Sequence, residues 1–228
     1  MNCLHFLAAI SLALLIAAPS KAADAAPSSA FELRGWKLQI PGPKDVKLLE
    51  GYSSDYFYLN DRQEMCFRLN AADKGVTPGA KYVRSELRHL PNWKVSESHT
   101  LSAALHVDCH LKPDKVTVLQ IHGIEESGKD APPLLRLAVN DGDLVAVVQY
   151  GNGRRENDAT VLKKDLSGAT VAIDVTVKAG QLTIRLDGQE KFNRRLDFWK
   201  HLNYFKAGCY PQATEGTGLV MFRKLTAN

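Results

Sequence analysis

The chain has 228 residues and a formal net charge of +4 at pH 7, and 45% of its residues are hydrophobic. This length and apolar content suit a single domain with a substantial core. The mildly basic balance, with no long basic run, fits a polyanionic partner without requiring one. No Cys-x-x-Cys motif occurs, which argues against a cysteine-based metal site or redox centre.

An apolar run near the N-terminus indicates export. Residues 4–18 are almost wholly apolar, but the run is too short for a comfortable membrane span. Ser-Lys-Ala at residues 20–22 then offers a small-x-small cleavage site. The alternative is an uncleaved membrane anchor, since no Lys or Arg precedes the run. The expected organisation is a signal peptide over residues 1–22, a flexible Ala/Ser/Pro-rich spacer over residues 23–30 and one domain over residues 31–228.

Export has two consequences. The protein is expected to be secreted or periplasmic, without a membrane partner, and this location argues against a nucleic-acid partner. Cleavage would also remove Cys3 and leave Cys66, Cys109 and Cys209. An oxidising compartment permits one disulfide and one free thiol among three cysteines, and the sequence does not choose the pair.

The dominant period after the spacer is two, which is typical of half-buried strands. Residues 101–111 alternate between apolar and mostly polar side chains. Two hairpins are predicted where alternating runs flank a turn, at residues 135–148 and at residues 171–186. One short helix is predicted within residues 191–202. Many short strands with Gly and Asp turns predict an all-β fold, an antiparallel β-sandwich.

The first of three informative segments is residues 82–88, where Tyr82, Arg84, Glu86 and Arg88 share one face of a predicted strand. Two arginines that flank a glutamate can form a rigid charged ladder. Guanidinium donors would remain free for a carboxylate, which arginine binds in a planar fork. The alternative is a solvated, salt-bridged strand.

The second segment is residues 116–123, where Gln120 and His122 point away from the side of Leu119 and Ile121. Two polar side chains that project together from an otherwise apolar strand are unusual. An imidazole can act as a base near neutral pH. The alternative is a histidine whose ring is satisfied by a hydrogen bond in the core.

The third segment, residues 204–212, places four polar or aromatic side chains on one face: Tyr204, Lys206, Tyr210 and Gln212. Gly208 lies between Lys206 and Tyr210 on that face, where a missing side chain would leave room for a ligand. Pro211 indicates an edge strand or a bulge. The alternative is an amphipathic strand with aromatic packing.

Together the three segments resemble the motifs of the alginate lyases of polysaccharide lyase family 7. Arg-Ser-Glu-Leu-Arg at residues 84–88, Gln-Ile-His at residues 120–122 and Tyr-Phe-Lys-Ala-Gly-x-Tyr-x-Gln at residues 204–212 match at every position and in family order. The resemblance implies a β-jelly roll whose concave sheet forms the substrate groove. It also implies endolytic cleavage of alginate by β-elimination, which leaves an unsaturated uronic acid at the new non-reducing end.

The resemblance and the chemistry of uronate cleavage assign roles to these residues. Removal of the C5 proton beside a carboxylate requires donors that neutralise the carboxylate, and Arg84 and Gln120 are expected to supply them. His122 is the candidate general base for guluronate, and Tyr210 is the candidate general acid for the C4 oxygen. For mannuronate, Tyr210 can serve as both. The expected substrate-binding residues are Glu86, Arg88, Lys206, Tyr204 and Gln212.

Two finer expectations concern Glu86 and the block preference. Glu86 is expected to orient the arginines, because its charge would repel a polyanion unless it were paired. Family members with Ile in the middle of the Gln-x-His motif tend to accept guluronate-containing blocks. Ile121 therefore favours that preference, although its side chain is expected to point away from the groove.

No metal or cofactor is expected. His106 and His110 are four residues apart, which separates them by roughly 13 Å along a strand. A monomer is the default oligomeric state.

Three other functions remain open: a non-catalytic module that binds acidic polysaccharide, a lyase for another polyuronate such as glucuronan, and a retaining glycosidase. A binding module would not need both His122 and Tyr210. A glycosidase needs two carboxylic acids in one cleft, and Glu86 is the single candidate on these strands.

Overall fold

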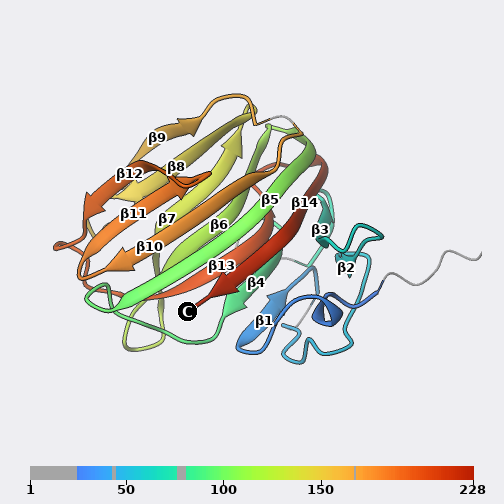
Figure 1. The fold of residues 1–228 in the computed structure, drawn as a ribbon, viewed down its shortest axis with the longest axis horizontal. Helices are drawn as coiled ribbons and strands as arrows, with labels where there is room; N and C mark the ends of the chain where they lie inside the picture. The colour runs from blue at the N-terminus through green and yellow to red at the C-terminus, as the bar shows by residue number, and fades with distance from the viewer. Residues whose placement is uncertain (1–24, 43–44, 76–80, 167) are drawn as a thin grey trace, which may run out of the picture.

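The computed structural model describes residues 25–42, 45–75, 81–166 and 168–228 (Figure 1). The predicted signal peptide over residues 1–22 lies outside these ranges. No helix in the described ranges is long and apolar enough to cross a bilayer.

The described residues form two antiparallel sheets of seven strands each, which confirms the predicted antiparallel sandwich. The first, called the β13 sheet below, contains in spatial order β1 (Trp36–Gln39), β4 (Ser85–His89), β13 (Leu202–Pro211), β6 (Lys115–Ile124), β7 (Asp130–Asn140), β8 (Asp143–Gln149) and β9 (Asn157–Lys163). The second, called the β5 sheet, contains β12 (Gln189–Arg195), β11 (Gln181–Leu186), β10 (Val171–Lys178), β5 (Ser98–Lys112), β14 (Glu215–Ala227), β3 (Met65–Asn70) and β2 (Phe57–Leu59).

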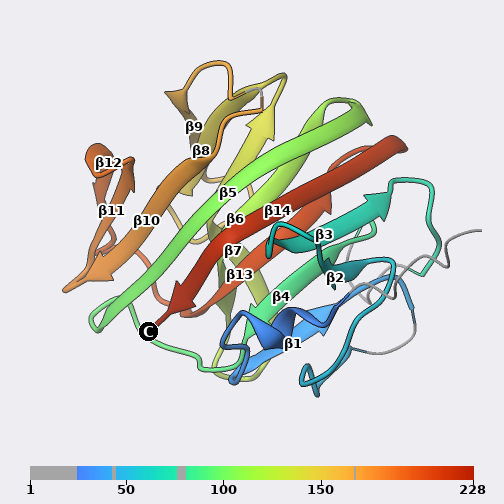
Figure 2. The ribbon, with the colours of Figure 1, turned by 45° about the vertical axis from the view of Figure 1, so that its right-hand side comes forward.

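The two sheets form successive layers. Figure 1 looks onto the β5 sheet, and the turned view in Figure 2 shows β10, β5 and β14 lying over β7, β6 and β13. One face of the β13 sheet is therefore directed into the sandwich and the other outward. The alternation of apolar residues predicts such a sandwich, because each strand buries one side, and the jelly-roll form is the one that the family resemblance implied.

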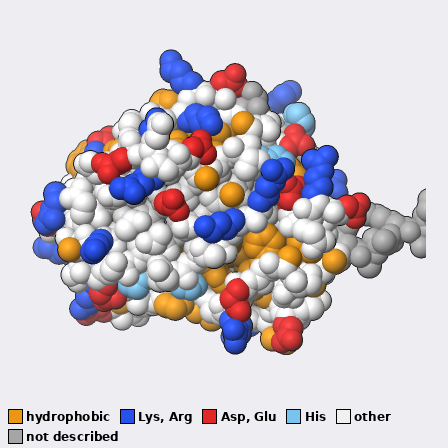
Figure 3. All heavy atoms as spheres, viewed as in Figure 1, with side chains coloured by type: hydrophobic (Ala, Val, Ile, Leu, Met, Phe, Trp, Pro, Cys, Tyr) orange, Lys and Arg blue, Asp and Glu red, His pale blue; other side chains and the backbone are white. Residues whose placement is uncertain are grey.

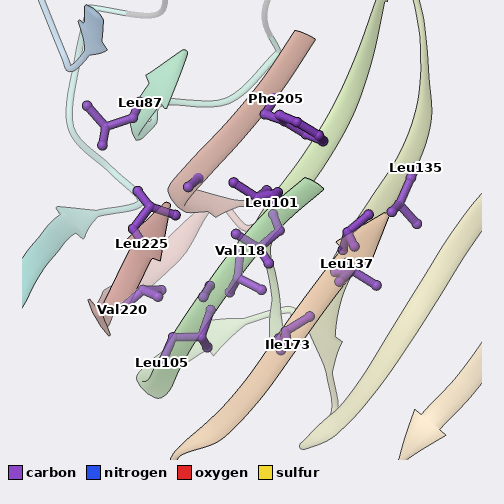
Figure 4. Packing of buried hydrophobic residues seen from close by; sticks show 14 of the residues in the cluster. Leu87, Leu101, Leu105, Val118, Leu135, Leu137, Ile173, Phe205, Val220 and Leu225 are labelled. Carbon is purple, nitrogen blue, oxygen red and sulfur yellow. The ribbon is translucent and has the colours of Figure 1, made fainter. Parts of the chain in front are cut away.

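The layer between the sheets is the core. Figure 4 shows Leu101 and Leu105 of β5 directed toward the same space as Val118 of β6, Leu137 of β7 and Phe205 of β13. All five side chains are fully buried. The alternation predicted for residues 101–111 is confirmed, since its apolar members pack in or against this core.

Both predicted hairpins are present. β7 and β8 are joined through Asp141 and Gly142, with φ of 48° and 82°. β10 and β11 are joined through Ala179 and Gly180, with φ of 48° and 74°. Two consecutive residues with positive φ give the turn whose twist matches that of the flanking strands.

The helix predicted within residues 191–202 is absent. Residues 189–195 form β12, which pairs with β11 at the edge of the β5 sheet. Leu196 and Trp199 are buried in the connection from β12 to β13. These two side chains anchor the loop to the core. The pairing of β12 with β11 outweighs the helix-like spacing of apolar residues in this segment.

The described part of the predicted spacer also differs from the prediction. Ala25 forms a β-bridge with Leu59, and Pro27 is buried in the short 3-10 helix η1 (Pro27–Ser29). The Ser28 hydroxyl accepts a hydrogen bond of 3.0 Å from the Gly51 amide. Residues 25–30 are therefore bound to the sandwich, because their backbone and apolar groups find partners that composition does not reveal.

Candidate active site

The three motif strands are neighbours in the β13 sheet, in the order β4, β13, β6. Their register places Arg88 opposite Lys206, Lys206 opposite Gln120, and Tyr204 opposite His122. The residues between these positions on each strand belong to the core cluster. The polar side chains therefore share the outward face of the sheet, as their period of two predicted.

Glu86 is fully enclosed at the centre of this face. Its carboxylate accepts hydrogen bonds from Gln120 Nε2 and Lys206 Nζ, and from Arg84 Nη1 at 3.2 Å. Burial alone would raise the pKa of the Glu86 carboxyl, but Lys206 and Arg84 hold that pKa below its usual range. Burial lowers the pKa of the Lys206 ammonium to about 8, although Glu86 opposes the change. Both groups are charged at neutral pH, so one carboxylate orients three donors.

The predicted ladder of two arginines around Glu86 is wrong for Arg88. The Arg88 guanidinium donates to the backbone carbonyls of His89, the last residue of β4, and Leu90, and to the Asn92 side chain. Its Cζ atom lies 4.1 Å from the centroid of the Tyr204 ring. Lys206 takes the place beside Glu86, because it comes from the adjacent strand and reaches the carboxylate directly.

Arg84 and Tyr210 lie against each other. Arg84 Cζ is 4.1 Å from the centroid of the Tyr210 ring. Arg84 Nε is buried without a hydrogen-bond partner among the described residues, so a strong donor remains for a ligand. Burial raises the pKa of the Tyr210 phenol while Arg84 opposes this, and the phenol keeps its proton at neutral pH.

His122 is held as a neutral imidazole. Its Nδ1 lies 2.9 Å from the Gly123 carbonyl, which requires the proton on Nδ1 and leaves the lone pair on Nε2. Burial, with a contribution from the Lys206 charge, lowers the pKa of His122 to about 4. The ring stacks on Tyr204, with centroids 5.2 Å apart and planes at 18°. Tyr204 thus lies between His122 and the Arg88 guanidinium, where burial raises its pKa to about 12.

Gly208 has a different purpose from the one that the sequence predicted. A β carbon there would lie 2.4 Å from the Ser85 carbonyl oxygen and 2.7 Å from Glu86 Cα, with φ at +150°. The missing side chain makes room for the backbone of β4 and not for a ligand. Gly208 is opposite Glu86 in the register, so this close approach helps to hold the carboxylate in the sheet.

The end of β13 is supported internally. Gln212 accepts a hydrogen bond of 2.9 Å from the Thr117 hydroxyl and donates one to the Tyr210 carbonyl. Its amide therefore stabilises the strand end beside Tyr210. Pro211 is in a central strand, so the edge alternative is wrong. The bulge alternative is right, since the register with β6 shifts between Ala207 and Tyr210.

Arg136 in β7 belongs to the same face and was missed at the sequence level. It is opposite Gln120, its charge interacts with Tyr210, and burial lowers the pKa of its guanidinium. With Gln149 and Arg154 it lines a hollow of about 120 Å³. The sequence does contain a signal for Arg136, which is the one charged residue in the apolar run of residues 131–139. Gln120 and His122 were recognised in the same way, as polar residues in an otherwise apolar strand.

The outward face of the β13 sheet differs in charge from the opposite side of the molecule. Arg84 and Lys206 contact the enclosed Glu86 carboxylate, and Arg88 and Arg136 add two more cations to the same face. On the outside of the β5 sheet, Figure 3 shows acidic and basic side chains interspersed. A larger hollow of about 610 Å³ lies there, lined mainly by threonines and exposed charged residues. Titratable groups with perturbed pKa values converge on the β13 sheet, which marks it as the site.

The chain is similar in sequence and in structure to proteins described as alginate lyases. A protein described as alginate lyase from a Photobacterium species is 26% identical over 77% of this chain and 73% of its own. The crystal structure of alginate lyase A1-II', a member of polysaccharide lyase family 7, matches with a TM-score of 0.83 and 28% identity, over 90% of this chain and 98% of that one. A substituted form of that enzyme, in complex with the substrate GGMG, matches with a TM-score of 0.81 and 29% identity, over 91% and 97%.

The sandwich and its cationic site, together with these likenesses, define the class of the protein, which is a polysaccharide lyase. The family model described as Alginate lyase matches residues 31–228, and the chain belongs to that family.

Proposed function

We propose that this chain cleaves alginate within the polymer by β-elimination, with a preference for guluronate-containing blocks, and that it acts outside the cytoplasm. The observation that carries the mechanism is the convergence of Arg84, Gln120, His122 and Tyr210 around the enclosed Glu86. The cationic face supports a polyanionic substrate. A relative of the same family binds the substrate GGMG.

Arg84 and Gln120 neutralise the carboxylate of the uronate that loses its C5 proton. That proton is only weakly acidic beside a charged carboxylate, because its removal places a second negative charge in the same group. Donors fixed in advance stabilise the enolate-like intermediate at no cost of reorganisation. Glu86 fixes both donors, and the buried Arg84 Nε has no other partner among the described residues.

His122 removes the C5 proton of guluronate through Nε2, and Tyr210 protonates the departing C4 oxygen. The depressed pKa of His122 keeps the imidazole neutral, as a base must be. The raised pKa of Tyr210 keeps the phenol protonated, as an acid must be. For mannuronate, whose C5 proton lies on the other face, Tyr210 serves as both base and acid. The base role requires the phenolate, which the adjacent Arg84 charge favours by opposing the rise in the pKa of Tyr210.

The burial of Glu86 disfavours a retaining glycosidase. Such an enzyme needs two carboxyl groups about 5–5.5 Å apart that reach the sugar. Glu86 is enclosed and bound to three side chains. Asp130, whose charge reaches His122 and Tyr204, is exposed at the start of β7.

The test is ultraviolet absorbance of the unsaturated uronate formed from alginate. Guluronate-rich blocks should react faster than mannuronate-rich blocks, and solution viscosity should fall well before absorbance reaches its limit. His122→Ala and Tyr210→Phe should each lower kcat by at least about 10³-fold. His110→Ala and Tyr150→Phe, at exposed positions, are the matched controls. No absorbance with any polyuronate would reject the lyase mechanism, and absorbance from glucuronan alone would reject the substrate.

A further inference from the structure

Two cysteines border the same small space inside the sandwich. Cys209 is fully buried in the core, and the half-buried Cys109 packs against that core from β5. Gly218 in β14 is directly opposite Cys109 in the sheet register. A β carbon at Gly218 would lie 2.8 Å from Cys209 Sγ and 3.5 Å from Cys109 Sγ. The absent side chain of Gly218 therefore leaves the two sulfur atoms facing a shared gap.

The strands that carry Cys209 and Gly218 come close together. Some Cα atoms of β13 and β14 lie within 8 Å of each other, whereas facing sheets usually lie about 10 Å apart. A hydrogen bond with Cys109, together with burial, raises the pKa of the Cys209 thiol. Cys109 is the more accessible of the two, so an oxidant meets it first.

Cys66 is placed differently. It lies between the core residues Met65 and Phe67 on β3, so its side chain is directed to the opposite face of the β5 sheet. Its Sγ lies 3.5 Å from the Glu64 carbonyl oxygen. Among the described cysteines, the geometry therefore joins Cys109 and Cys209 and sets Cys66 apart.

We propose that Cys109 and Cys209 form a disulfide that ties the catalytic strand β13 to the β5 sheet. The oxidant is a low-molecular-weight disulfide such as oxidised glutathione. The Cys109 thiolate attacks its S–S bond and releases one thiol, and the Cys209 thiolate then attacks Cys109 Sγ and releases the second. One S–S bond breaks and one forms. The two protein thiols are oxidised, and their protons appear on the two released thiols.

The bond would bear on the active site because Tyr210 follows Cys209 directly. Cross-links that close long loops stabilise a fold chiefly by restricting the unfolded chain. This link joins residues far apart in the chain and immobilises the strand that carries Tyr204, Lys206 and Tyr210.

The full chain should be refolded in a buffer of reduced and oxidised glutathione, alkylated, digested without reduction and mapped by mass spectrometry. The expected result is a cross-linked peptide pair containing Cys109 and Cys209, with Cys66 alkylated. The oxidised protein should melt about 5–10 °C above the reduced protein. Cys109→Ala should abolish this difference, and Cys66→Ala should preserve it. Alkylation of both Cys109 and Cys209, or a cross-link that involves Cys3 or Cys66, would overturn the proposal.

Discussion

His122 shows how a single residue acquires a catalytic character from its surroundings. A free histidine titrates near neutral pH, whereas burial lowers the pKa of His122 to about 4. The bond to the Gly123 carbonyl fixes which nitrogen carries the proton. His122 therefore stays neutral, and able to accept a proton, over a wider pH range than an exposed imidazole would.

This pKa gives a signed prediction for the dependence of activity on pH. A base works when it is neutral, so kcat/KM should persist from pH 7 to about pH 5 and fall as pH drops through about 4. Initial rates of absorbance increase would give the profile, with near-ultraviolet circular dichroism at each pH to verify folding. A decline centred near pH 6.5 in folded protein would contradict the assignment of His122.

Arg84 and Arg88 carry the same charge but have different partners, which predicts different kinetic effects. Arg84→Ala should lower kcat by about 10²–10³-fold, because it removes a donor that stabilises the intermediate. Arg88→Ala should mainly raise KM, since Arg88 lies over Tyr204 and away from Glu86. Steady-state kinetics on guluronate-rich substrate would separate the two. The reverse order of kcat losses would overturn the assigned roles.

At the scale of the element, β13 is the strand on which the site depends. It pairs with β4 on one side and β6 on the other, and it contributes Tyr204, Lys206 and Tyr210 to the active face while burying Phe205 in the core. Its close contact with β4 depends on the absence of a side chain at Gly208.

Gly208→Ala should destabilise the fold by about 3 kcal/mol, because the new β carbon would overlap the β4 backbone at a positive φ. Gly188→Ala is the matched control: its φ is +80°, but nothing lies within 4 Å of the new carbon. That variant should lose only about 1–2 kcal/mol. Urea unfolding measures the free energy of unfolding of both variants. Equal losses would show that the close approach of β4 to Gly208 does not contribute to stability.

At the scale of the whole molecule, the two sheets have different electrostatic characters. The β13 sheet presents a cluster of cationic side chains, and the outside of the β5 sheet presents mixed charges (Figure 3). A polyanion is attracted to the former, and dissolved salt screens the attraction over a Debye length of about 10 Å at 0.1 M.

KM for alginate should therefore rise several-fold between roughly 0.05 and 0.5 M salt, while kcat changes little. Arg136→Gln should weaken this dependence. Arg185→Gln, at an exposed position on the β5 sheet, should leave it unchanged. Identical salt dependences in the two variants would show that the attraction does not arise at the active face.

The sequence by itself determined what depends on local order along the chain. A period of two assigned Arg84, Gln120, His122 and Tyr210 to polar faces, because side chains alternate across any strand. Turn residues determined the hairpins for the same local reason. The motifs of three segments were sufficient to identify the family.

Only the tertiary structure decided what depends on neighbouring strands and on burial. In the structure, Lys206 and not Arg88 is the partner of Glu86, and Arg136 lies on the same face as the site. Gly208 is in close contact with the β4 backbone, and Cys109 lies beside Cys209. The structure also has β12 in place of a predicted helix. Strand order, register and desolvation arise between segments far apart in the chain, and no local pattern encodes them.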